Sequence, residues 1–234
     1  MEDMLLAFGE AARLIAGLDR ELVAIVTLSL QVSLSAVAIS TAIGLPIGAM
    51  IAVGRFPGRQ MVIALLNGLM GLPPVVVGLL IYLLLSRAGP LGGFGLLFTP
   101  AAMVVAQSVL IVPIAAALSR QVIEDAWREY EEQLRSLGSS LFSSALTLLW
   151  DTRFSLVTVV LAGFGRAAAE VGAVIIVGGN IDGVTRVMTT TIALETSKGN
   201  LPLALGLGVI LIGLVLGVNA TAHLIKETAQ RHYG

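Results

Sequence analysis

The chain has 234 residues, of which 56% are hydrophobic and only 12% are charged, and its mean hydropathy is +0.94. Soluble domains carry about 25% charged residues, so this composition cannot cover a water-exposed surface. The net charge of −1 gives no sign of a nucleic-acid partner, and the lack of cysteine excludes disulfides and cysteine-bound metal. We therefore expect an all-α, polytopic membrane protein with about five helical spans.

The start of the chain predicts an interfacial helix over 1–20 that does not cross the membrane. This segment, which begins MEDMLLAFGE, is acidic where a signal peptide needs positive charge, so insertion is expected to use the spans themselves. One helix face carries the apolar residues Met4, Phe8, Ala11, Ile15 and Leu18.

The first predicted span, 22–53, is longer than the ~30 Å hydrocarbon core at ~1.5 Å per residue, so it must tilt, project or kink at Pro46. Gly44 and Gly48 stand in GxxxG spacing within it, which predicts close packing with another helix.

The second predicted span, 61–85, contains Pro73 and Pro74, which remove two backbone donors and predict a broken helix. Such a break is compatible with a packing kink and with a place on a transport pathway. The remaining predicted spans are 101–118, 154–177 and 201–225.

Basic residues in the connections predict the orientation of the chain, because positive loops stay in the cytoplasm. Eight basic residues fall on one side and five on the other, which puts the N-terminus outside and the C-terminus in the cytoplasm. The larger set is Arg55, Arg59, Arg120, Arg128, Arg135, Arg153, Lys226 and Arg231, and the smaller is Arg13, Arg20, Arg87, Arg186 and Lys198.

Residues 119–153 are the most charged part of the chain and predict a cytoplasmic connection. Gly138 can end an amphipathic helix there, and the serines after it can cap the next helix. A helix lying on the anionic inner leaflet is usually basic, whereas acids predominate here, so a docking helix for a protein partner is favoured over a surface helix. The apolar stripe is Trp127, Tyr130, Leu134, Leu137 and Leu141.

Arg166 and Glu170 lie inside the fourth predicted span, where a charge costs at least ~2.5–3.5 kcal/mol. Their spacing of four predicts one helix face, and both a structural ion pair and a pathway role remain open. Downstream, Thr189, Thr190 and Thr191 offer hydroxyl donors to an anion or cap an extracellular connecting helix.

Two segments resemble a known family. In EEQLRSLG, Glu132 is followed six residues later by Gly138, which resembles the EAA loop of ABC importer permeases. Gln133 and Leu134 replace the family's two alanines, and LLWD at 148–151 replaces its Ile-x-Leu-Pro. The segment FGRAAAEVGAVIIVGGNIDGVTRVMTT is similar to permeases of the molybdate, tungstate and sulfate type, and TRVMTTTIALETSKGNLPLALG looks most like the tungstate branch.

The resemblance implies a single transmembrane permease domain over 1–234 in the cell membrane, of the type I ABC importer kind, with 119–153 as its cytoplasmic coupling loop. It also implies a homodimer that pairs with two ATPase subunits and receives an oxyanion from an extracytoplasmic binding protein. Tungstate is the expected anion, with molybdate and sulfate as alternatives, and no cofactor or metal is implied.

The resemblance assigns two groups of site residues. Neither lysine of the chain ends a P-loop, so ATP hydrolysis is expected in a separate subunit and no enzymatic activity in this one. ATPase coupling falls to Glu131, Glu132, Arg135 and Gly138, and the translocation pathway or gate to Arg166, Glu170, Asn180, Thr189 and Thr190.

The residues also bear on two other functions. A self-contained secondary carrier or channel would explain the buried charges and the Pro73–Pro74 break, but not the acidic helix in the connection. An intramembrane enzyme is disfavoured, because His223 and His232, the only histidines, lie at or beyond the end of the last span.

Overall fold

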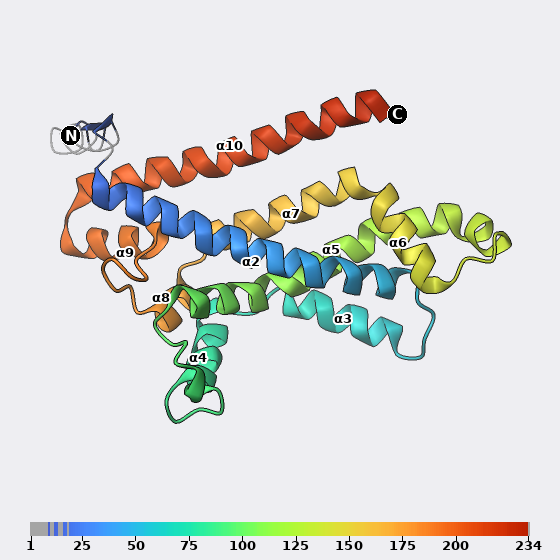
Figure 1. Ribbon diagram of the computed structural model, residues 1–234, viewed down its shortest axis with the longest axis horizontal. Helices are drawn as coiled ribbons and strands as arrows, with labels where there is room; N and C mark the ends of the chain where they lie inside the picture. The colour runs from blue at the N-terminus through green and yellow to red at the C-terminus, as the bar shows by residue number, and fades with distance from the viewer. Residues whose placement is uncertain (1–8, 10–11, 14–15, 18, 234) are drawn as a thin grey trace. The chain divides into compact units, whose positions relative to one another are not determined.

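The computed structural model describes residues 9, 12–13, 16–17 and 19–233, and the side chains of these except 223 and 225–233. Within this part of the chain the secondary structure is helical, without strands (Figure 1). The all-α prediction is therefore confirmed. The interfacial helix predicted over 1–20 falls mostly outside the described residues.

The long helices are α2 (Arg20–Val53), α5 (Pro100–Ser136) and α10 (Leu201–Tyr233). The shorter ones are α3 (Arg59–Leu69), α4 (Pro74–Leu85), α6 (Leu141–Asp151), α7 (Arg153–Ala168), α8 (Gly172–Gly178) and α9 (Met188–Lys198), with a 3-10 turn, η1, at Gly92–Phe94.

Among the described residues, three helices are long and apolar enough to cross a membrane, and two bent pairs raise the number to five if each pair is one span. The α3–α4 pair bends by 97° and the α6–α7 pair by 79°. Because the first bend lies at Pro73 and Pro74, the predicted break in the second span is confirmed. The expectation of about five spans agrees with this arrangement.

Two predicted boundaries differ from the structure. The span over 101–118 and the amphipathic helix after it are one helix, α5, which continues through Pro113. The fourth predicted span is not one helix, since α7 ends at Ala168 and α8 begins at Gly172. The prediction that Arg166 and Glu170 share one helix face is therefore wrong, because Glu170 lies outside both helices.

The chain forms two compact units. The first contains α2 up to Ser35, Pro73–Gln107 and Ala167–Val218, and the second contains Ala36–Leu72, Ser108–Arg166 and the chain from Asn219 onward. The division therefore falls inside α2, α5 and α10 and close to the two places where helices break.

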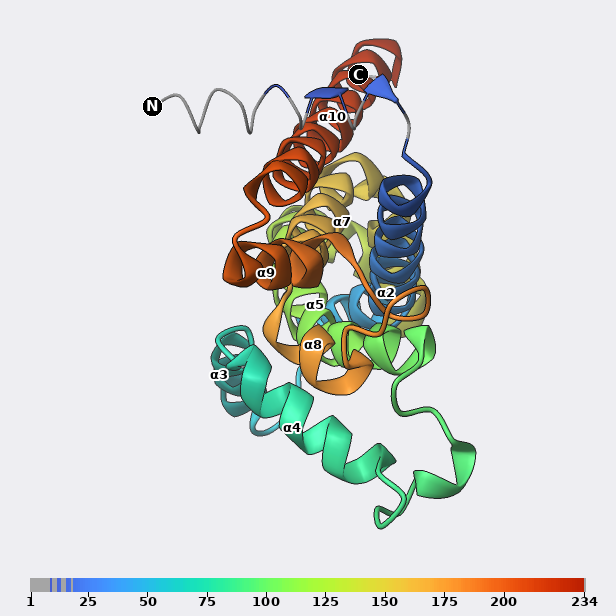
Figure 2. The ribbon, with the colours of Figure 1, turned by 90° about the vertical axis from the view of Figure 1, so that its left-hand side faces the viewer.

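In the first unit, α4 packs against α8 (Figure 2). Glycines allow the close approach: a Cβ at Gly78 would lie 2.8 Å from the Ala173 Cα, and a Cβ at Gly172 would lie 2.9 Å from a Val75 methyl group. A separate apolar cluster joins α2, α9 and α10 through Leu22, Ile25, Met188 and Leu207.

In the second unit, α2 packs closely against α5. A Cβ at Gly44 would lie 2.6 Å from the Ala115 Cβ, and one at Gly48 would meet Ser119. This contact confirms the close packing that the GxxxG spacing predicts. Further along both helices, Val53, Ile123, Trp127 and Leu148 form a core shared by α2, α5 and α6.

Candidate functional site

The break between α7 and α8 is held by side chains from other helices of the first unit. Gln107 Nε2 of α5 donates to the Ala167 carbonyl at 3.1 Å, and Thr189 Oγ1 of α9 donates to the Glu170 carbonyl at 2.8 Å. Away from water, an interrupted helix is tolerated only where such partners replace the lost backbone hydrogen bonds. The break is therefore a fixed feature of the fold.

The Glu170 side chain caps the start of α8. It is 3% exposed, and its Oε1 accepts a hydrogen bond from the Ala173 backbone N–H at 2.9 Å. The first N–H groups of a helix lack intrahelical partners and carry a positive dipole end, so a carboxylate is stabilised there. This contact gives a structural reason for a buried acid at this position.

Arg166 lies in the last turn of α7, where a cation is favoured by the negative end of the helix dipole. It is half-buried and belongs to the second unit, whereas Glu170 belongs to the first.

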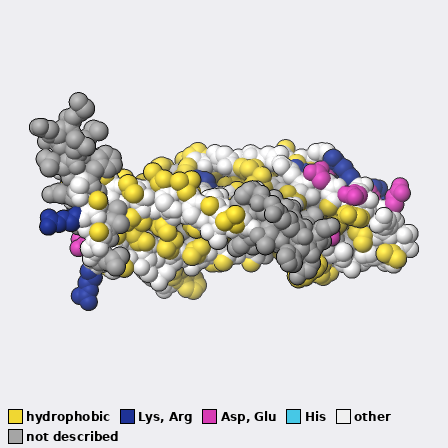
Figure 3. All heavy atoms as spheres, turned by 90° about the horizontal axis from the view of Figure 1, so that it is seen from above, with side chains coloured by type: hydrophobic (Ala, Val, Ile, Leu, Met, Phe, Trp, Pro, Cys, Tyr) yellow, Lys and Arg dark blue, Asp and Glu magenta, His cyan; other side chains and the backbone are white. Residues whose placement is uncertain are grey.

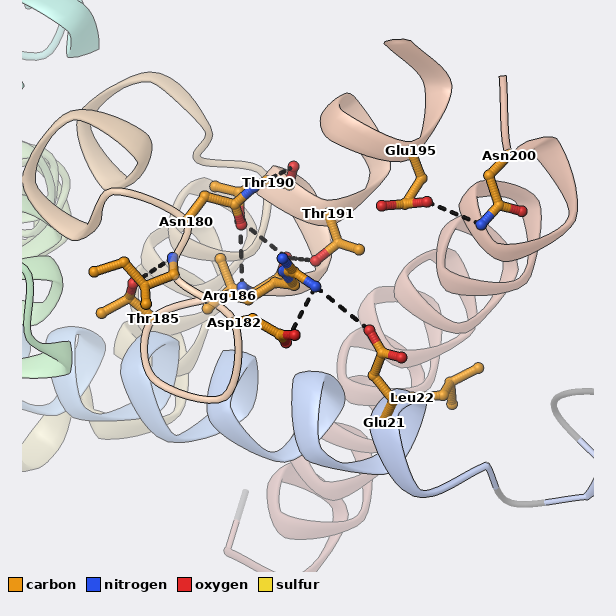
Figure 4. A network of polar contacts seen from close by, with 12 residues as sticks. Glu21, Leu22, Asn180, Asp182, Thr185, Arg186, Thr190, Thr191, Glu195 and Asn200 are labelled. Atoms are coloured by element: carbon orange, nitrogen blue, oxygen red, sulfur yellow. Dashed lines mark hydrogen bonds and ion pairs between the residues drawn. The ribbon is translucent and has the colours of Figure 1, made fainter. Parts of the chain in front are cut away.

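Asn180 and Thr190 are hydrogen-bonded to each other where the chain turns after α8 (Figure 4). Asn180 has a left-handed backbone with φ 49°, which asparagine adopts more readily than most residues. Its Oδ1 accepts a hydrogen bond from Thr190 Oγ1 at 2.8 Å. The gate residues Glu170, Asn180, Thr189 and Thr190 are thus brought together around α8 and the start of α9.

The hydroxyls of the threonine run are used inside the protein. Thr189 donates to the Glu170 carbonyl, Thr190 to Asn180, and Thr191 to the Val187 carbonyl at 2.7 Å. Of the two interpretations of this run, the capped connecting helix describes the observed contacts, because an anion would have to displace these acceptors.

Arg186 is a further charged residue in this polar region. Its Nη1 lies 3.1 Å from Asp182 Oδ1 and 3.5 Å from Glu21 Oε1, so it joins the turn before α9 to the start of α2 (Figure 4). The pairing of Arg186 with Glu21 could not be predicted from spacing, since Glu21 is 165 residues away in the chain.

Glu195 near the end of α9 is a buried carboxylate that the sequence analysis missed. Lys198 Nζ and Asn200 Nδ2 donate to its two oxygens at 2.8 and 2.9 Å. These two hydrogen bonds hold the pKa of Glu195 below its usual value, against the opposing effect of burial. The available signal was the Glu–Lys spacing of three just before Gly199.

The second candidate site is the hairpin formed by α5 and α6. Gly138 has φ 71°, and the Ser139 N–H bonds to the Leu134 carbonyl at 3.0 Å, so α5 ends in a Schellman-type cap. Ser140 Oγ then accepts from the Ser143 N–H at 3.2 Å and caps α6. The predicted helix end at Gly138 and the predicted serine cap are both confirmed.

The base of the hairpin is packed, and its tip, residues 137–142, is mostly exposed. Trp127 belongs to the core, with Tyr130 and Leu134 packed against it, as the apolar stripe predicted. Leu137 and Leu141 were predicted on the same stripe, but they are 81% and 45% exposed because α5 ends at Ser136.

The acidic residues of the hairpin divide into two kinds. Glu131 pairs with Arg55 and with Arg135, each at 2.7 Å, so its charge is balanced by arginines of the same chain. Glu132 is exposed and, among the described side chains, makes no ion pair. Acidic and basic side chains gather near the C-terminal end of α5, at the right-hand edge of Figure 3.

Comparison with the sequences of known proteins shows the family of this chain. No protein-family model matches the chain. The probable anion ABC transporter permease protein of Haloferax volcanii is 43% identical over 211 residues, which cover 88% of this chain and 91% of that protein. The chain belongs to the ABC transporter permease family.

Two further relatives of the permease are tungstate uptake system permease proteins. The one from Peptoclostridium acidaminophilum is 36% identical over 227 residues, covering 97% of this chain and all of that protein. The one from Campylobacter jejuni is 38% identical over 174 residues, covering 74% of this chain and 73% of that protein. The resemblance to the tungstate branch is thereby confirmed.

Family membership makes the chain a multi-pass membrane protein and a transport subunit. It therefore favours an ABC transporter over the self-contained carrier and the intramembrane enzyme.

Proposed function

We propose that the permease forms the membrane pathway of an ATP-driven importer for an oxyanion, with tungstate as the substrate and molybdate or sulfate as alternatives. Its similarity to two tungstate uptake permeases supports this substrate. A homodimer binds two ATPase subunits, and an extracytoplasmic binding protein delivers the anion. The N-terminus lies outside and the C-terminus in the cytoplasm.

The α5–α6 hairpin carries this proposal, as the surface where an ATPase subunit docks. Large apolar side chains exposed outside the lipid mark interaction sites, and Leu137 and Phe142 are 81% and 64% exposed at the tip. Glu132 beside them is free to pair with a basic group of the partner. Glu131 and Arg135 hold the helix in position, and Gly138 permits the turn.

The break between α7 and α8 is proposed as the gate of the pathway. Glu170, Asn180, Thr189 and Thr190 keep the interrupted backbone in place through the contacts described above. Arg166, the arginine at the end of α7, supplies the positive charge that attracts the anion. The gate residues thus position the backbone, and Arg166 meets the substrate.

Reconstitution in vesicles tests the proposal. Vesicles containing the permease, the ATPase subunit and the tungstate-loaded binding protein should take up tungstate only when ATP is supplied on the ATPase side. Vesicles with the permease alone should take up none under an ion gradient. Gradient-driven uptake by the permease alone would instead establish a self-contained carrier.

A further inference from the structure

An apolar groove of about 400 Å³ opens between α2, α6 and α7 in the second unit. This volume is within the range of small-molecule sites. Apart from Thr41 and Arg153, its lining side chains are apolar, and they include Leu45, Pro46, Leu149, Leu156, Val157 and Val160.

Arg153 is the charged residue of the groove, and its guanidinium is held between aromatic rings. It lies 4.8 Å from the centre of the Trp150 ring and 4.4 Å from the centre of the Phe154 ring, and Nη1 donates to the Trp150 carbonyl at 2.7 Å. Among the described side chains, Arg153 pairs with no carboxylate, so its charge is uncompensated. Trp150 is 72% exposed, and tryptophan beside arginine is typical of the membrane–water interface.

We propose that this groove is a binding site for an anionic phospholipid of the surrounding bilayer. One acyl chain lies along the apolar lining, and the Arg153 guanidinium binds the headgroup phosphate. A guanidinium presents paired N–H donors that match phosphate oxygens, and its stacking on two rings fixes its orientation beforehand. The occupant is argued from this charge complementarity and from the membrane setting of the chain, and it does not depend on which anion is transported.

The groove lies beside helices that belong to the proposed ATPase docking hairpin and to the α6–α7 bend, so a bound lipid can affect coupling. The α2 wall of the groove contains Pro46, and its other walls are the two helices of the α6–α7 bend. A lipid seated there contacts both the part of α2 around Pro46 and α6, the second helix of the hairpin. Anionic lipid is therefore expected to raise ATPase stimulation.

Lipid binding to the purified permease–ATPase complex in nanodiscs tests the site. The probes are phosphatidylglycerol and phosphatidylcholine, and retention is measured by native mass spectrometry. The variants are Arg153→Met, Arg153→Lys and Val157→Trp, which fills the groove. The matched control is Arg87→Met, because Arg87 is an exposed arginine that does not line this groove.

We expect the wild type to retain phosphatidylglycerol in preference to phosphatidylcholine. Arg153→Met should weaken phosphatidylglycerol retention about fivefold, as for one basic group near an anionic surface, and Val157→Trp should weaken retention of both lipids. Arg153→Lys should keep the preference, and Arg87→Met should match the wild type.

Three results would overturn the site. Equal losses in Arg153→Met and Arg87→Met would show general electrostatic attraction, and unchanged retention in Arg153→Met would show that no headgroup is bound there. Because the chain has no cysteine, Val157→Cys also provides a unique label. Disulfide formation between two copies at this position would show that a second copy fills the groove.

Discussion

Arg55 Nη2 and Glu131 Oε1 lie 2.7 Å apart and join the connection after α2 to the last part of α5. A second pair, Arg59 and Glu124, makes the same connection at 3.2 Å, and Arg59 Nε also donates to the Ile51 carbonyl at 2.9 Å. Glu124 and Glu131 are seven residues apart and so share a helix face. A force applied at the hairpin can therefore reach α2 and α3 through these two pairs.

The Arg55–Glu131 pair is predicted to transmit movement and to add little stability. Arg55→Met and Glu131→Gln should each lower the ATPase stimulation that the loaded binding protein causes. The double variant should show no less stimulation than the single variant with the lower value. The unfolding free energy should fall by less than about 1 kcal/mol, because the Arg55 side chain is largely exposed. Additive losses in stimulation, or no loss at all, would show that the pair does not couple the two parts.

Glu132→Arg is predicted to abolish ATPase stimulation without affecting membrane insertion, because it reverses a charge beside the hairpin tip that pairs with none of the described side chains. Asp125→Arg is the matched control, since Asp125 is an exposed acid on the same helix but further from the tip. ATPase rates and co-purification of the ATPase subunit are the measurements. Wild-type stimulation in Glu132→Arg would contradict the docking assignment.

Glu170 is predicted to act mainly through the hydrogen bond that caps α8. Glu170→Gln keeps an oxygen acceptor for the Ala173 N–H, whereas Glu170→Ala leaves that buried donor unpaired. Glu170→Ala should lower the unfolding free energy by about 1–2 kcal/mol, and Glu170→Gln should lower it by less than half as much. Equal losses in thermal unfolding would instead point to the charge itself.

Arg166 is predicted to attract the transported anion through its positive charge. Arg166→Met should reduce tungstate uptake strongly while the complex still assembles, because it keeps the apolar stem and removes the charge. Arg87→Met, which removes an exposed arginine, should leave uptake unchanged. Normal uptake and assembly in Arg166→Met would show that this residue neither meets the anion nor holds the gate.

The stability of the permease is predicted to fall at acid pH through Glu195. Hydrogen bonds from Lys198 and Asn200 keep its folded-state pKa below the unfolded-state value of about 4.3, so its contribution is present above that pH. The contribution is lost as the pH falls through the lowered pKa. Thermal unfolding from about pH 7 to pH 3 should show Glu195→Gln less stable at neutral pH, with the difference shrinking in acid. A difference that stays constant would contradict this.

Local chemistry in the sequence predicted several features of the fold. Two adjacent residues without backbone donors, Pro73 and Pro74, mark the start of α4, although the single Pro113 lies inside α5. Gly138 ends one helix, and Ser140 caps the next. These features depend on residues within a few positions of one another. The helix ends and breaks that such residues encode were therefore predictable before the structure.

The features that the sequence did not reveal depend on distant partners. Ala167, Ala168 and Ala169 favour a continuous helix, yet α7 ends at Ala168. Gln107 and Thr189 satisfy the carbonyls of Ala167 and Glu170, and Glu170 caps α8. Arg55 and Glu131 are 76 residues apart, so their pairing could not be inferred from spacing. Arg166 and Glu170 are recognisable in the sequence as charges within a predicted span, but the contacts of the proposed gate residues are shown only by the structure.

Cross-linking of the hairpin tip to the ATPase subunit tests the central claim most directly. Phe142→Cys and Phe94→Cys place single thiols at two exposed phenylalanines, 64% and 72% exposed, in a chain that has no other cysteine. In the assembled transporter, the thiol at 142 should cross-link to the ATPase subunit and the thiol at 94 should not. Equal cross-linking from both positions, or none from 142, would contradict the assignment of the hairpin as the ATPase docking surface.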